Sequence, residues 1–236
     1  PGRTAGRGAT QELRRTRAPG LHDHIGDVVA MRAACRPLAD PDGTPGQDSL
    51  GSSCEPRRVT TDETSLPPAS WGDPRSRTVT WHDPMITAAG ALERSGLEAL
   101  QAIRDGVLPP APIGMLMQFD IRAIEEGRVE FGCVLDESAY NPIGVVHGGL
   151  VCTLLDTVAG CAVHTTLPAG VGYTSIELKV NYLRAVHGSS GPLTAIGRVV
   201  KPGRRVAFAE GEVLDAVGRT VATASSSLLV FPLPAA

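Results

Sequence analysis

The stretch Asn141-Pro-Ile-Gly-Val-Val-His-Gly-Gly149 leads into an almost wholly apolar segment that continues to Thr166. Apolar residues recur in this segment at helical spacing and cover more than one helical face; they are Leu150, Val151, Leu154, Leu155, Val158, Ala159, Ala162 and Val163. A helix this apolar belongs in the core of a folded domain. We therefore expect a central helix from about His147 to Thr166, with the rest of the domain packed around it.

One acid, Asp156, interrupts the apolar helix, and we expect it to be buried there. A buried carboxylate is costly unless it is paired or hydrogen-bonded, so this residue requires an explanation. Gly148 and Gly149 lie at the predicted N-terminus, where backbone N–H groups lack intrahelical partners and stabilise negative charge. This combination indicates catalysis. The alternatives are a glycine pair that only permits close packing and an acid that is only structural.

Alternating residues predict strands on both sides of the helix. Before it, residues 119–123 and 129–133 flank a turn at Glu125-Glu126-Gly127, which predicts a hairpin. After it, short turns join four more predicted strands, at residues 175–182, 193–201, 204–214 and 219–231. In the first of these we expect one buried face, formed by Ile176, Leu178, Val180 and Tyr182. The fold class is therefore α+β, with a curved, largely antiparallel sheet wrapped around the central helix.

The N-terminal third of the chain has a different composition from the rest. Residues 1–77 are rich in Gly, Pro, Ser, Thr and Arg and show no helical or strand period, which predicts a disordered extension. We expect the folded domain at residues 78–236, with its core at 115–231. Residues 78–112 predict a helical lead-in that begins at Asp83-Pro84, continues at helical spacing to about Val107 and is ended by prolines.

Composition and missing motifs exclude several classes of function. The 236 residues carry a formal net charge of -3, which gives no electrostatic case for a nucleic-acid partner. The five cysteines are odd in number and lack Cys-x-x-Cys spacing, which favours a reduced, cytoplasmic protein. Residues 145–167 are long enough to cross a membrane, but their histidines and Asp156 favour a buried helix instead. Zinc spacing, a Gly-x-Ser-x-Gly elbow and nucleotide-binding loops are absent from the sequence, so we expect no metal and no cofactor.

The motif at residues 141–149, followed by Leu154-Leu155-Asp156 and by Tyr173-Thr-Ser-Ile-Glu-Leu178, resembles the PaaI-type acyl-CoA thioesterases of the hotdog fold. The resemblance covers about residues 115–231. It implies hydrolysis of an acyl-CoA thioester to a carboxylic acid and coenzyme A, in a homodimer or homotetramer.

The same resemblance implies a role for each matching residue. Asp156 would activate the water or attack the thioester carbonyl itself, and the Gly148 N–H would polarise that carbonyl. Asn141 would orient the carbonyl, Ser175 would help to hold the water, and His147 would orient neighbouring groups rather than act as a base. A developing negative charge on the carbonyl oxygen is what a helix N-terminus stabilises.

Spacing along the helix constrains how these groups act together. Positions 148 and 156 differ by eight, which is roughly 12 Å of helix at about 1.5 Å per residue. One reaction centre about 3 Å from both groups is therefore impossible within one chain. If both groups act on one thioester, Asp156 must come from a second chain, and the site must lie at a dimer interface, as it does in the family.

A set of basic residues is a candidate for binding the phosphates of coenzyme A. Lys201, Arg204 and Arg205 surround a predicted turn, and with Arg184 we expect them to form one basic region. The alternative is that these charges are simply solvated. Two rival functions remain. The first is a non-catalytic acyl-CoA-binding or regulatory hotdog module. The second is a hotdog dehydratase, but His147 and Asp156 do not match the arrangement of histidine and acid in those enzymes. The acyl group is not identified by the sequence.

Overall fold

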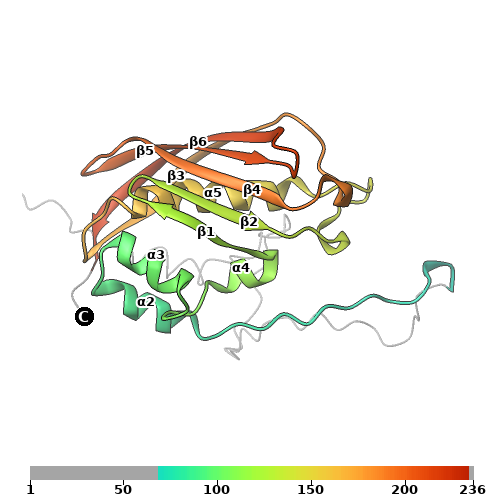
Figure 1. The fold of residues 1–236 in the computed structure, drawn as a ribbon, viewed down its shortest axis with the longest axis horizontal. Coiled ribbons are helices and arrows are strands. Elements are labelled where there is room, and N and C mark those ends of the chain that lie inside the picture. Colours follow the sequence, from blue (N-terminus) through green and yellow to red (C-terminus); the bar gives the residue numbers. More distant parts are fainter. Residues whose placement is uncertain (1–68, 234–236) are drawn as a thin grey trace, which may run out of the picture. The chain divides into compact units, whose positions relative to one another are not determined.

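The computed structural model describes residues 69–233, which form a curved six-stranded sheet around one long helix, with shorter helices below one edge of the sheet (Figure 1). The helices are η1 (Ala69–Trp71), α2 (Pro84–Leu92), α3 (Gly96–Arg104), α4 (Pro112–Met117), η2 (Glu137–Ala139), α5 (Gly148–His164) and η3 (Gly188–Ser190). The strands are β1 (Phe119–Glu125), β2 (Arg128–Cys133), β3 (Val171–Tyr182), β4 (Leu193–Lys201), β5 (Val206–Leu214) and β6 (Thr220–Pro232).

The sheet has the strand order β1-β2-β4-β5-β6-β3, and each neighbouring pair is antiparallel. The prediction of an α+β fold, with an antiparallel sheet wrapped around a central helix, is confirmed. Two strands precede α5 and four follow it, as the alternating residues predicted. In this order β1 and β3 are the two edge strands, and β3, with 12 residues, is a long one.

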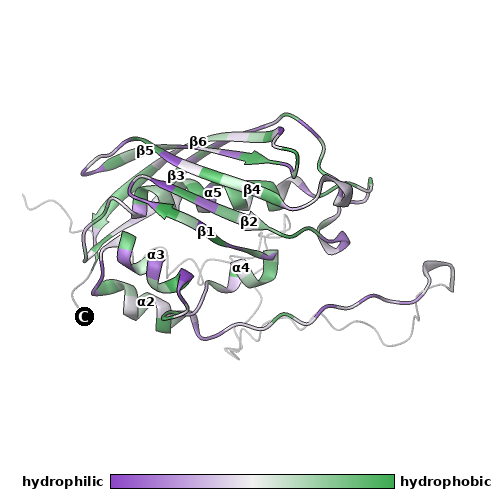
Figure 2. Ribbon diagram, viewed as in Figure 1, coloured by the Kyte–Doolittle hydropathy of each residue, from purple (hydrophilic) through white to green (hydrophobic). Residues whose placement is uncertain are grey.

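The central helix α5 packs against the sheet through its apolar residues. Leu154, Leu155 and Val158 are completely buried, and hydrophobic residues alternate with hydrophilic ones along the strands (Figure 2). The closest approach lies on β4, where a Cβ on Gly197 would be 2.0 Å from the Val158 carbonyl oxygen. Only glycine lets the strand come so near the helix. Within residues 69–233, no helix combines the length and hydropathy of a membrane span.

The helical lead-in differs from the single helix that we expected. It consists of α2 and α3, because Ser95 begins a new helix: its hydroxyl accepts from the Glu98 N–H, and the Glu98 carboxylate accepts from the Ser95 N–H. The proline-rich segment after Val107 also forms a helix, α4, with a proline in its first turn, a position that proline tolerates. Three shorter helices therefore replace one helix and a proline-rich break.

The lead-in is anchored on the end of the central helix. The Gly96 N–H donates to the Leu167 carbonyl at 2.9 Å, and a Cβ on Gly96 would lie 1.9 Å from the His164 carbonyl oxygen. The helix α3 therefore packs directly on the C-terminal turn of α5. Part of the segment predicted as a disordered extension, residues 69–77, is described, and there Arg77 pairs with Asp136 at 3.1 Å. Residues 1–68 lie outside the described residues, so that prediction stays a prediction.

Candidate active site

The acid Asp156 lies in the middle of α5 and is exposed in the single chain. Our expectation that it would be buried is wrong, because the sheet does not close completely around the helix and leaves this side of α5 uncovered. Its partner is Ser175 on β3, whose hydroxyl donates to Asp156 Oδ1 at 2.7 Å. The structure thus brings together two of the residues that the sequence singled out. An exposed carboxylate held by one hydroxyl still has lone pairs available for a water molecule or a substrate.

A β-bulge explains why Ser175 faces the helix. The register between β3 and β6 shifts between Ser175 and Glu177, so that Ile176 has no partner residue on β6. Our prediction of strict alternation placed Ile176 with Leu178 on the buried face and Ser175 on the opposite face. The extra residue reverses this: Ile176 is 56% exposed, and Ser175 points at Asp156. Bulges commonly redirect side chains beside active sites in this way.

The N-terminus of α5 is capped by the histidine of the motif. His147 is the N-cap residue, and its Nδ1 accepts from the Gly149 N–H at 2.8 Å, which places the proton of the neutral ring on Nε2. The backbone N–H of His147 donates to the Ala139 carbonyl at 2.7 Å. His147 therefore holds the turn that leads into α5. Within the described residues, the Gly148 N–H has no acceptor, so it is available to a ligand.

Tyr182 is a neighbour of Gly148 that the sequence did not reveal. Its hydroxyl donates to the Gly148 carbonyl at 3.0 Å, and a Cβ on Gly148 would lie 3.1 Å from its ring. Partial burial raises the pKa of Tyr182 above its ordinary value, and the nearby Cys152 thiol raises it further by a smaller amount. The phenol therefore stays protonated and remains a hydrogen-bond donor. The contact spans 34 positions of sequence. Only the path of β3 across the end of α5 brings the two residues together.

Asn141 closes the loop that precedes α5. Its side-chain Oδ1 accepts from the N–H groups of Ile143 and Val145, at 3.1 and 3.3 Å, and its own N–H donates to the Val145 carbonyl at 2.8 Å. Gly144 completes this turn with a φ of +80°, which favours glycine. The amide oxygen of Asn141 therefore holds the loop. Its NH₂ group is left as the donor that could reach a carbonyl.

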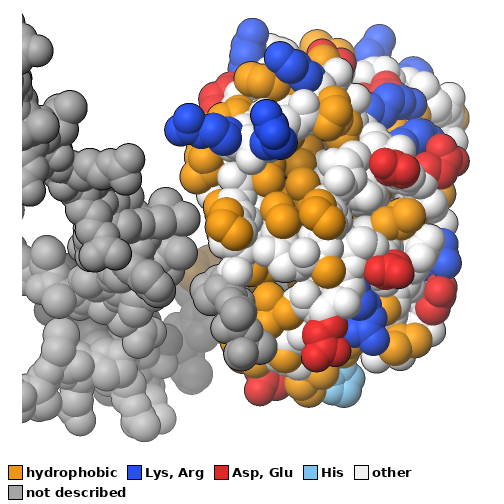
Figure 3. All heavy atoms as spheres, turned by 90° about the vertical axis from the view of Figure 1, so that its left-hand side faces the viewer, with side chains coloured by type: hydrophobic (Ala, Val, Ile, Leu, Met, Phe, Trp, Pro, Cys, Tyr) orange, Lys and Arg blue, Asp and Glu red, His pale blue; other side chains and the backbone are white. Residues whose placement is uncertain are grey.

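The four basic residues do not form one region within a chain, so this prediction is wrong. The Arg205 carbonyl accepts from the Val230 N–H, whereas the Arg184 N–H donates to the Val221 carbonyl. Positions 221 and 230 of β6 differ by nine, which is roughly 30 Å at about 3.3 Å per residue. Lys201, Arg204 and Arg205 are exposed at the β4–β5 turn, on a face where Lys and Arg side chains gather (Figure 3). Arg184 lies at the other end of the sheet.

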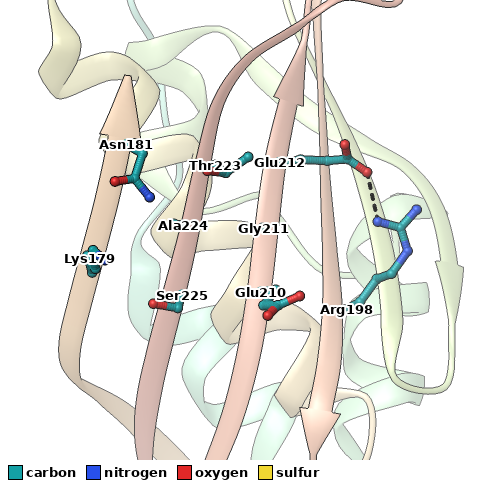
Figure 4. Close-up of a pocket in the computed structure, with 9 residues that line it drawn as sticks. All are labelled: Lys179, Asn181, Arg198, Glu210, Gly211, Glu212, Thr223, Ala224 and Ser225. Carbon is teal, nitrogen blue, oxygen red and sulfur yellow. Dashed lines mark hydrogen bonds and ion pairs between the residues drawn. The ribbon is translucent and has the colours of Figure 1, made fainter. Parts of the chain in front are cut away.

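Of two cavities on this part of the molecule, one borders the candidate site and the other does not. One, of about 290 Å³, is lined by Gly148, Tyr182 and Arg184 at the N-terminal end of α5. The other, of about 430 Å³, is lined by polar and charged side chains, among which Arg198 and Glu212 pair at 2.8 Å (Figure 4). On β5, a Cβ on Gly211 would point at Leu155 of α5, so its neighbours Glu210 and Glu212 face away from the helix. The second cavity is therefore on the outer face of the sheet, away from Asp156.

Comparison with known proteins agrees with this fold. The family model described as the thioesterase superfamily matches residues 143–222, which include Gly148, Asp156 and Ser175. A candidate esterase from Saccharolobus solfataricus is 33% identical over 110 residues, which cover 46% of this chain and 76% of that protein. Acyl-coenzyme A thioesterase 13 of Homo sapiens is 31% identical over 98 residues, which cover 41% of this chain and 68% of that protein.

Solved structures show the same architecture. The PaaI protein from the phenylacetic acid degradation operon of E. coli superposes with a TM-score of 0.52 at 18% identity, over 61% of this chain and 99% of that chain. An antiparallel sheet around one central helix is thus the hotdog fold, and the relatives of 31–33% identity make the protein a thioester hydrolase. The chain belongs to the thioesterase superfamily.

Proposed function

We propose that this protein hydrolyses acyl-CoA thioesters to a free carboxylic acid and coenzyme A, at a site shared by two chains. Asp156 acts as the general base or as the nucleophile, and the Gly148 N–H polarises the thioester carbonyl. The observation that carries the proposal is the contact of Ser175 with Asp156 on the uncovered side of α5. The printed name of the human relative, an acyl-coenzyme A thioesterase, supports the substrate class.

The chemistry of thioester hydrolysis fits these groups. Attack on the carbonyl builds negative charge on its oxygen, and a fixed N–H donor at a helix N-terminus stabilises that charge. Gly148 supplies such a donor, and the Asn141 NH₂ is the second candidate. Ser175 donates to one carboxylate oxygen of Asp156 and leaves the other for a water molecule or for direct attack. These steps use groups of the chain alone, and we propose no cofactor and no metal.

The helix itself argues for two chains. The helix α5 runs without a break from Gly148 to His164, so the roughly 12 Å between positions 148 and 156 is not shortened by a kink. The proposal therefore pairs Asp156 of one chain with Gly148 of a second. A homodimer is the smallest assembly that supplies both groups, and a homotetramer would contain two such dimers.

The edge strand β3 is the candidate surface for this dimer. It is 12 residues long, and Ile176 and Tyr182 are each 56% exposed in the single chain. An exposed edge of this length presents unpaired backbone groups that a second strand can satisfy. Along β3, Ser175 lies beside Asp156 of α5, and Tyr182 lies beside Gly148 at the N-terminus of α5. An antiparallel pair of β3 strands brings the Tyr182 end of one chain to the Ser175 half of the other.

The same dimer would place the separated basic residues at one end. Antiparallel pairing of two sheets aligns the β4–β5 turn of one chain with the Arg184 end of the second chain. Lys201, Arg204 and Arg205 would then approach Arg184 of the partner subunit, and this set suits the phosphates of coenzyme A. Exposed charges that bind only water remain the alternative for these four residues.

Replacing Asp156 by Asn tests the proposal directly. The change keeps the size of the side chain and removes the carboxylate, so kcat should fall by about 10²- to 10⁴-fold while acyl-CoA binding is retained. Release of free thiol from acyl-CoA, followed with a thiol-trapping reagent, measures kcat, and a thermal unfolding curve shows that the fold is intact. Rates equal to those of the wild type would contradict the mechanism.

The same assay separates the rival functions. A non-catalytic binding or regulatory module would bind acyl-CoA without releasing thiol. A dehydratase would act on a hydroxyacyl or enoyl thioester and leave the thioester bond intact. The contact of His147 Nδ1 with the Gly149 N–H disfavours the dehydratase, because one nitrogen of the ring is occupied as a helix cap.

A further inference from the structure

A cavity of about 280 Å³ lies between α5 and the lead-in helices, apart from the cavities described above. Most of its wall is apolar. Leu100 and Ile103 of α3 and Ile113 of α4 form one side, and Phe119 and Phe131 of the sheet form the other. The two phenylalanine rings pack edge to face with their centroids 6.0 Å apart. Two charged residues, Arg104 and Asp120, also line the cavity, and each is paired with a neighbour, Asp105 at 2.8 Å and Arg122 at 3.1 Å. The rest of the wall suits an apolar group.

Another part of the wall is the central helix, at the turn that follows the candidate catalytic acid. Thr157, the residue after Asp156, and Cys161, one turn later, both line it. The Thr157 hydroxyl donates to the Thr153 carbonyl at 2.7 Å, so it presents its methyl group rather than a free donor. Burial raises the pKa of the Cys161 thiol to about 12, which keeps this side chain uncharged. The helix side of the cavity is thus uncharged, and it begins at the residue that follows the exposed carboxylate in α5.

We infer that this cavity holds the acyl group of the substrate, and that the substrate is the thioester of a neutral, apolar acid of medium size. The inference rests on the proposed function, because the thioester carbonyl must lie at Asp156. A volume of about 280 Å³ lies at the lower end of the range for small-molecule sites, which is roughly 300–1,000 Å³. An eight-carbon chain or a phenyl ring with a short linker fits this space. A sixteen-carbon chain would extend beyond it.

The position of the cavity also assigns the residues that set specificity. Leu100, Ile103, Ile113, Phe119 and Phe131 all precede residue 143, so they lie outside the segment that matches the thioesterase superfamily. The matched segment carries the reactive groups, and the lead-in helices with the first hairpin select the acyl group.

Replacement of Ile113 by Trp tests this division of roles. Ile113 is 41% exposed, so a larger side chain can be accommodated without disturbing the buried core, and it fills the cavity from the α4 side. The wild type should prefer octanoyl-CoA and phenylacetyl-CoA over both acetyl-CoA and palmitoyl-CoA. The Ile113→Trp variant should lose about tenfold or more in kcat/KM for the two medium-sized substrates, with kcat/KM for acetyl-CoA unchanged. Val217→Trp, at a turn residue that is 75% exposed, is the matched control.

A binding measurement keeps the inference separate from the catalytic proposal. S-octyl coenzyme A is a thioether that cannot be hydrolysed, and its affinity can be measured by calorimetry in wild-type and Ile113→Trp protein. The inference predicts that the variant binds S-octyl coenzyme A about tenfold more weakly, with the affinity for S-ethyl coenzyme A unchanged. Equal losses for both ligands, or no loss for either, would overturn it. If the selective loss is found in a protein that releases no thiol, the acyl site stands and the proposed hydrolysis fails.

Discussion

The Ser175 hydroxyl donates to Asp156 Oδ1 at 2.7 Å, across the uncovered side of the central helix. This contact depends on the bulge at Ile176, and it positions the only carboxylate of α5. A hydrogen bond to a charged group contributes about 1.5–3 kcal/mol, which corresponds to roughly a tenfold to hundredfold change in rate. We expect Ser175→Ala to lower kcat by this factor and to leave KM nearly unchanged.

The control for this prediction is Ser225→Ala on β6, because Ser225 is an exposed serine on the outer face of the sheet. Thiol release by the two variants should differ although their unfolding temperatures agree. If both variants retain the wild-type rate, Ser175 does not position the acid.

A mixed dimer of two inactive chains tests whether each site is shared. One chain carries Asp156→Asn. The other carries Gly148→Pro, which removes the N–H while keeping the helix, because proline is tolerated at the first helical position and His147 already has an extended ψ of 131°. Random co-assembly makes about half of the dimers mixed, each with one intact site, so about a quarter of the wild-type activity should return. If each site lies within a single chain, the mixed dimers should show no activity.

Gly148→Ala is the matched variant for the proline change. It introduces the Cβ that would lie 3.1 Å from the ring of Tyr182 but keeps the backbone N–H. We expect it to retain much more thiol-releasing activity than Gly148→Pro. Equal losses in the two variants would show that crowding against Tyr182, rather than the missing donor, causes the defect.

His164 should make the protein less stable in acid. Burial lowers the pKa of His164 below its ordinary value of 6.5, so the unfolded chain binds the proton more readily than the folded chain. The contribution of neutral His164 to the free energy of unfolding is complete above about pH 6.5. It is lost as the pH falls from that value towards the lower pKa of His164 in the folded protein. Between about pH 7.5 and about pH 5, the unfolding temperature should fall further for the wild type than for His164→Gln. Parallel pH dependence in the two proteins would contradict this.

The packing of α3 on α5 predicts that Gly96→Ala is destabilising. The added Cβ would lie 1.9 Å from the His164 carbonyl oxygen, a backbone atom that cannot move independently of α5. We expect a loss of about 1–3 kcal/mol in the free energy of unfolding, measured with denaturant. Gly90→Ala is the control, because its Cβ would meet only the flexible end of Leu108, and alanine favours the helix. A variant of Gly96 as stable as the wild type would mean that the lead-in is loosely attached.

Much of the fold follows from local patterns in the sequence. The apolar period of residues 150–163 predicts α5, and alternation with short turns predicts six strands in a largely antiparallel sheet. The apolar period does not predict the break between α2 and α3, because the period continues through it. The cap at Ser95 decides where the second helix begins. The bulge at Ile176 was missed for a related reason, since one unpaired residue leaves little trace in an alternating pattern.

The sequence by itself determined which residue types form the candidate site and in what order they follow along the chain. The Gly148–Asp156 spacing is a property of any regular helix, so the sequence by itself indicates that the two groups act on one thioester only across two chains. Tertiary structure alone decided which residues meet. It placed Ser175 beside Asp156 and Tyr182 beside Gly148, left the acid exposed, and put Arg184 and Arg205 at opposite ends of the sheet. The physical reason is that these contacts depend on the curvature of the sheet and on strand register, which many weak interactions over the whole domain set together.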